Sequence, residues 1–94
     1  MRVPSTQALR ALDSFARHGS VWRAAEELHL TRSAVSHQLR LLERDLGFDL
    51  LERVGKGVAL TVRGRRYAHD VHKALAMLGD AGARYGDGGI GGSF

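Results

Sequence analysis

Apolar residues recur at intervals of three and four along the first half of the chain, the spacing that places side chains on one face of a helix. This pattern predicts three helices, over residues 5–18, 21–28 and 32–46. Their apolar faces consist of Leu9, Leu12, Phe15 and Ala16, of Ala24, Ala25 and Leu28, and of Val35, Leu39, Leu42 and Leu46. The second face is short and built mostly from small residues, which suits a helix that crosses another at close range.

Capping residues separate these three predicted helices. Ser5, Ser20 and Thr31 stand where each helix would begin, and a hydroxyl group there can accept a hydrogen bond from a free backbone N–H group. Gly19 and Gly47 stand where the first and third helices would end, because glycine adopts the left-handed conformation at little cost. Two short helices joined by three or four residues are typical of a helix-turn-helix.

The third predicted helix has a polar face opposite its apolar one. A rotation of about 100° per residue groups these polar side chains together. They are Ser33, Ser36, His37, Arg40 and Arg44. The face is basic and carries no bulky apolar group, so it can enter a groove of a binding partner.

A hairpin is predicted after the third helix. Residues 51–53 and 58–60 favour two short strands, and the glycines between them supply the geometry of a tight turn. A hairpin that follows a helix-turn-helix is a wing, and this one would carry Arg53 and Lys56 at its tip.

A last, long helix is predicted over residues 62–84, with Thr61 as its cap. Its apolar seam contains Tyr67, Val71, Leu75 and Leu78, and continues to Ala81 or Gly82. The seam either packs only against Leu12 and Phe15 of the first helix, or also pairs with the same helix of a second subunit. A helix of about 22 residues is about 33 Å long. Only part of that length can cover so small a domain, which favours a dimer.

Composition and charge narrow the class of partner. The chain has 94 residues, one domain at most plus an appendage, and a net charge of +4 that suits nucleic acid or an anionic membrane. No apolar run is long enough to span a membrane, and the first four residues do not begin a signal peptide. The absence of cysteine fits a cytoplasmic protein.

Several short motifs, taken in order, resemble one protein family. The longest runs from residue 24 to residue 43, AAEELHLTRSAVSHQLRLLE. It is followed by Leu46-Gly47, Leu50-Leu51-Glu52-Arg53 and Leu60-Thr61-x-x-Gly64. Over about residues 4–85 the chain resembles the amino-terminal part of the LysR-type transcriptional regulators. Its Val35-Ser36-His37-Gln38 run looks most like the glycine-cleavage activators within that family.

The resemblance implies an all-α fold with a small β-wing, in which a winged helix-turn-helix is followed by a long linker helix that dimerises. Residues 1–61 would form the DNA-binding domain and residues 62–85 the linker helix. The glycine-rich residues 86–94 would form a hinge towards an effector domain, so the chain is interpreted as a fragment of a longer protein.

The resemblance also implies a function, the sequence-specific binding of double-stranded DNA to control transcription in the bacterial cytoplasm. Members of the family bind interrupted inverted repeats, often with a T and an A bounding the half-sites. They carry a periplasmic-binding-protein-like effector domain and form tetramers from two kinds of dimer. A small-molecule co-inducer is therefore expected for the effector domain, contact with RNA polymerase is a further expectation, and no cofactor is expected in this chain.

Family positions give the candidates for base contacts, whereas charge and place in the fold give the backbone candidates and the apolar seam gives the dimerisation candidates. The candidates for contact with base edges are Arg32, Ser33, Ser36 and His37. The candidates for contact with the DNA backbone or, at the wing, with the minor groove are Arg23, Thr31, Gln38, Arg40, Arg53 and Lys56. The candidates for dimerisation are Tyr67, Val71, Leu75 and Leu78. The alternative for each polar side chain is that it is simply solvated.

Two residues depart from the family pattern and leave the identity of the DNA site open. Arg32 stands where Gln is common, and Trp22 stands where a small hydroxyl residue is usual. The indole N–H group of Trp22 could donate to a phosphate. A lone tryptophan in a small domain is more often a packing residue, and we expect packing here.

Other functions are less well supported by the sequence. His69 and His72 are spaced like a pair of metal ligands, but we expect them to be solvated because no cysteine or carboxylate partner is evident. Ser33, Ser36 and His37 lack the third orienting group and the oxyanion site of a nucleophile, so an enzyme is not expected. The remaining alternative is a winged helix that serves as a protein-interaction or assembly module without specific DNA readout.

Overall fold

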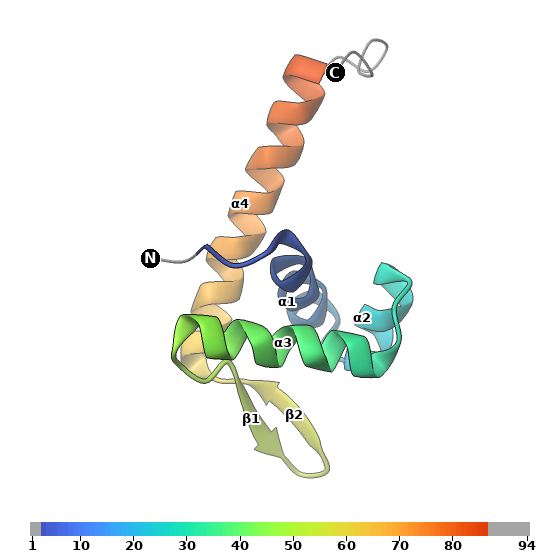
Figure 1. Cartoon of the computed structure of the whole chain (residues 1–94), viewed down its shortest axis with the longest axis vertical. Helices are drawn as coiled ribbons and strands as arrows, with labels where there is room; N and C mark the ends of the chain where they lie inside the picture. The colour runs from blue at the N-terminus through green and yellow to red at the C-terminus, as the bar shows by residue number, and fades with distance from the viewer. Residues whose placement is uncertain (1–2, 87–94) are drawn as a thin grey trace.

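The computed structural model describes residues 3–86 (Figure 1). Its elements are α1 (Thr6–His18), α2 (Val21–Leu28), α3 (Arg32–Leu46), β1 (Leu51–Val54), β2 (Gly57–Leu60) and α4 (Val62–Gly86). Helices α1, α2 and α3 pack against one another, the hairpin projects to one side of them, and α4 extends past α1 in the opposite direction. The predicted all-α fold with a small wing is confirmed. The hinge predicted over residues 86–94 lies outside the described residues, apart from Gly86 at the end of α4.

The predicted caps begin and end the helices. The amino-terminal caps are Ser5, Ser20, Thr31 and Thr61. Each hydroxyl oxygen accepts a hydrogen bond from the backbone N–H group three residues further on, at 2.9–3.2 Å. Gly19 and Gly47 end α1 and α3 in the left-handed conformation, with φ of 68° and 79°. His29 also adopts it, with φ of 56°, at the end of α2.

One cluster of buried side chains joins the helices and the hairpin. It contains Ala8, Ala11, Leu12, Phe15, Ala24, Ala25, Val35, Leu39, Leu42, Leu50, Leu60, Ala68 and Val71. The prediction that Ala16 belongs to the inner face of α1 is wrong, because its side chain is exposed. The neighbouring helices cover the face of α1 that runs through Ala8, Leu12 and Phe15, and they leave Ala16 beyond its edge.

Helix α4 packs against the body of the domain only along its first half. Val71 is buried, and Tyr67 and Leu75 are half-buried against the core, whereas Leu78 is 68% exposed. The amino-terminal part of the predicted seam therefore packs within the chain, and the carboxy-terminal part faces solvent. None of the helices within residues 3–86 combines the length and the apolar character that crossing a membrane requires.

The start of α4 is fixed against the start of β1. The backbone N–H group of Thr61 donates to the carbonyl oxygen of Leu50 at 2.8 Å, and its hydroxyl group donates to the carbonyl oxygen of Asp49 at 2.8 Å. Gly64 lies so close to Leu50 that a Cβ atom on it would clash with the carbonyl oxygen of that residue. This contact explains why a glycine stands in the first turn of α4.

Candidate nucleic-acid interface

The polar face predicted for α3 is open to solvent. Val35, Leu39 and Leu42 are fully buried against the rest of the domain, so the opposite side of the helix faces outwards. The exposed side chains are Arg32, Ser33, His37, Arg40 and Arg44, and the half-buried ones are Ser36 and Gln38. All four candidates for base contacts therefore lie on one helix, within its first two turns.

The first turn of α3 holds its hydroxyl groups in fixed positions. The Oγ1 atom of Thr31 accepts from the N–H group of Ala34 at 3.1 Å and lies 3.2 Å from the Oγ atom of Ser33. Arg32, between them, is exposed and takes part in none of the ion pairs found within residues 3–86. Its guanidinium is thus available to a partner in the groove.

The hairpin presents a second basic surface. Strands β1 and β2 are antiparallel, with Arg53 opposite Val58 and Val54 opposite Gly57. Gly55 makes the turn with φ of 59°, and Lys56 follows it at the tip. Arg53 and Lys56 are both exposed. Figure 1 shows the hairpin projecting away from α4, beside α3.

Glu43 connects α3 to the hairpin, and the sequence did not predict this role. Its Oε2 atom accepts hydrogen bonds from the backbone N–H groups of Leu50 and Leu51, at 2.9 and 3.1 Å. These groups lie where the chain enters β1, so one carboxylate on α3 sets the position of the strand that carries Arg53.

Glu43→Ala should lower the free energy of unfolding by about 2–3 kcal/mol, because two backbone donors lose a charged acceptor. Glu52→Ala is the matched control, since Glu52 is exposed on β1 and its loss should change stability by about 0.5 kcal/mol or less. Urea denaturation of both variants measures the difference. Equal losses in the two variants would contradict a connecting role for Glu43.

A largely exposed hydrogen-bond network around Glu27 fixes α2 on α1. Glu27 accepts two hydrogen bonds from the guanidinium of Arg17, at 2.9 and 2.5 Å, and one from the hydroxyl group of Ser14 at 2.5 Å. The hydrogen bonds from Arg17 and then from Ser14 lower the pKa of Glu27 to about 2. The pair correspondingly raises the pKa of Arg17 above its usual value. The carboxylate is therefore ionised at neutral pH and ties α2 to α1.

The side chain of His72 is exposed, as expected, but the expectation that it has no carboxylate partner is wrong. Its Nδ1 atom lies 2.7 Å from Oδ1 of Asp13, whose other oxygen accepts from Nε of Arg17 at 3.0 Å. Asp13 is 59 positions earlier in the chain, so only the packing of α4 on α1 brings the two together. His69 is exposed. Within residues 3–86 no three His, Cys, Asp or Glu side chains are grouped as a metal ion would require.

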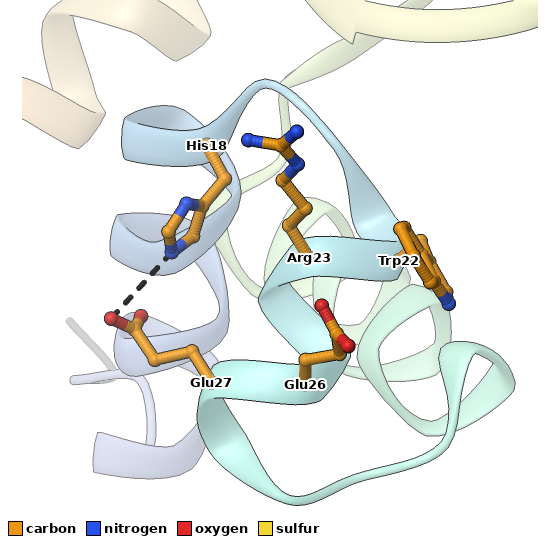
Figure 2. A pocket seen from close by; sticks show the side chains of 5 residues that line it. All are labelled: His18, Trp22, Arg23, Glu26 and Glu27. Carbon is orange, nitrogen blue, oxygen red and sulfur yellow. Dashed lines mark ion pairs between the residues drawn. The ribbon is translucent and has the colours of Figure 1, made fainter.

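The packing role expected for Trp22 is also wrong. Trp22 is 57% exposed, because Ala24 and Ala25 supply the buried face of α2 and Trp22 lies outside that face. Figure 2 shows its ring on the outer side of α2, away from α1.

Three packed helices, an exposed polar face on the third and a hairpin directly after it define a winged helix-turn-helix domain. The family model described as bacterial regulatory helix-turn-helix protein, lysR family, matches residues 6–65. The chain belongs to this family.

Its relatives are regulators of transcription. The glycine cleavage system transcriptional activator of Escherichia coli (strain K12) is 44% identical over 80 residues, which cover 85% of this chain and 26% of that protein. Its homolog in Haemophilus influenzae is 42% identical over 83 residues, 88% of this chain and 28% of the relative. The resemblance to this group is confirmed, and the chain spans little more than a quarter of these relatives.

The fold is also similar to a solved protein–DNA complex. The crystal structure of the CbnR_DBD–DNA complex matches with a TM-score of 0.76 and 32% identity, covering 85% of this chain and 92% of that one.

Proposed function

We propose that this domain binds a specific sequence in double-stranded DNA, with α3 in the major groove and the hairpin on the flanking backbone. The observation that carries the proposal is the exposed, basic and unobstructed face of α3, set beside a basic hairpin. The similarity to the CbnR_DBD–DNA complex supports it. Nothing found in the fold or among the relatives favours the alternative of a protein-interaction module without DNA readout.

Within that geometry the candidate residues for DNA contact divide into two groups. Arg32, Ser33, Ser36 and His37 lie nearest the amino-terminal end of α3, which reaches the base edges in helix-turn-helix proteins. The backbone group consists of Arg23, Thr31, Gln38, Arg40, Arg53 and Lys56. Backbone contacts supply affinity and register, whereas contacts to base edges supply specificity.

The carboxy-terminal half of α4 is the proposed dimer interface. Met77 and Leu78 are 70% and 68% exposed within a single chain, and Ala81 is half-buried. An antiparallel pair of α4 helices from two subunits would cover this surface. The resulting two-fold symmetry would require an inverted repeat in the DNA.

The remaining proposals are drawn from the relatives and from the family. The relatives are three to four times the length of the matched segment, and we propose an effector domain with a small-molecule co-inducer, tetramers, and contact with RNA polymerase. This chain would need no cofactor and would be a binding domain without enzymatic activity, acting at the nucleoid in the cytoplasm.

The salt dependence of DNA binding tests the proposal. Lys56→Ala should weaken binding to all sequences by a similar factor and reduce the slope of log K against log salt concentration by about 0.9, because one phosphate contact is lost. Fluorescence anisotropy of a labelled duplex measures both quantities. An unchanged slope would remove Lys56 from the interface, and a wild-type protein without salt-dependent DNA binding would contradict the proposed function.

A further inference from the structure

Trp22 borders an open groove formed by α2 and the last residue of α1. The groove has a volume of about 470 Å³ and is lined by His18, Trp22, Arg23, Glu26 and Glu27 (Figure 2). An indole that is 57% exposed forgoes much of the stabilisation that burial would give it. Tryptophan is enriched at binding interfaces, because its ring supplies a large contact area and its N–H group a directed hydrogen bond.

The position of Trp22 in the domain indicates what covers it. It occupies the first turn of α2, and in Figures 1 and 2 this end of the helix is directed towards the side of the domain that carries the hairpin. In helix-turn-helix proteins the helix before the recognition helix crosses the DNA backbone while the recognition helix enters the groove. A DNA strand whose backbone runs between α3 and the hairpin therefore passes the first turn of α2.

The charges in the groove favour a phosphate at the end near Arg23. Glu27 is neutralised by Arg17, and its Oε2 atom lies 3.6 Å from Nε2 of His18. Arg23 is exposed and has no ion-pair partner within residues 3–86. Glu26 lies one turn beyond Trp22, so an anion would be repelled from that end and drawn towards Arg23.

We propose that Trp22 is a DNA-backbone contact of this domain, with its Nε1–H group donating to a phosphate oxygen and its ring lying against the adjacent sugar. Arg23 neutralises the neighbouring phosphate. The assignment rests on the proposed function and adds to it a neutral contact, which contributes affinity for every DNA sequence but releases no counterion.

The single tryptophan of the chain makes the contact directly observable by intrinsic fluorescence. Acrylamide quenching is measured for the wild-type protein, free and bound to a labelled duplex recovered by selection from random DNA, while anisotropy of the label reports binding. Protection of Trp22 on binding is the expected result. Binding without protection would overturn the contact. It is also the result expected if the groove binds a protein partner instead of DNA. Absence of binding would contradict the proposed function itself.

Substitution then separates the neutral contact from the charged one. Trp22→Phe keeps a ring and removes the donor, so affinity should fall roughly three- to tenfold with an unchanged salt slope. Arg23→Gln should lower the slope by about 0.9. Tyr85→Phe, which removes a donor from a ring that is 81% exposed far along α4, is the matched control and should bind like wild type. Equal affinities of Trp22→Phe and Tyr85→Phe, with both variants folded by circular dichroism, would overturn the assignment.

Discussion

Leu78→Asp should give a folded monomer that has lost most of its affinity for an inverted repeat. Leu78 is 68% exposed in the single chain, so the domain does not need it to fold. In the proposed dimer the aspartate would be buried without a partner, which costs several kcal/mol and prevents pairing of the α4 helices. A dimer that binds both half-sites at once has an affinity roughly 10²–10⁴-fold higher than one subunit on one half-site. A monomer loses that advantage.

Sedimentation equilibrium measures the assembly, and anisotropy on duplexes with one or two half-sites measures the loss of affinity. Ala76→Asp is the matched control, because Ala76 is exposed two positions away on the opposite side of α4. We expect Ala76→Asp to remain dimeric. A Leu78→Asp protein that stays dimeric, or a wild-type protein that is monomeric, would contradict the interface.

Arg32→Gln should weaken binding by about 1–3 kcal/mol and change the preferred base at one position of each half-site. The guanidinium of Arg32 offers two parallel donors, and guanine presents two acceptors, N7 and O6, on its major-groove edge. Glutamine both donates and accepts, which suits adenine better. We therefore expect a G in the half-site of the wild-type protein, read by Arg32 in the first turn of α3.

Anisotropy with both proteins on two duplexes, carrying G or A at that position, measures this preference. Wild type should favour G, and Arg32→Gln should lose or reverse the preference. Arg40→Gln is the control on the same helix, since a backbone contact weakens all sequences alike. Equal weakening of both duplexes by Arg32→Gln would place Arg32 on a phosphate and exclude the guanine contact.

The local architecture could be predicted from the sequence because its determinants lie within a few residues of one another. The hydroxyl groups of Ser20 and Thr31 each bond to an N–H group three residues away, and Gly47 ends α3 through its own φ angle. The spacing of apolar residues placed the buried face of α3, and hence its exposed face. These features do not depend on how the helices cross.

The features that were missed depend on that crossing. Arg17 and Glu27 are ten residues apart, and His72 is 59 residues from Asp13, so no local spacing relates them. Trp22 was expected to pack because a lone tryptophan in a small domain usually does, yet the way α2 lies on α1 and α3 turns Ala24 and Ala25 inwards and leaves Trp22 outside. Glu43 belongs to the family motif, but its link to the hairpin requires the turn that follows Gly47.

Selection of bound sequences from random duplex DNA with the wild-type chain is the most direct measurement of DNA recognition by α3. An interrupted inverted repeat should be enriched, with the same half-site on both sides of a spacer and a G at the position that Arg32 reads. Recovery of no preferred sequence, or of a single half-site without its inverted copy, would contradict a dimer that reads DNA through α3.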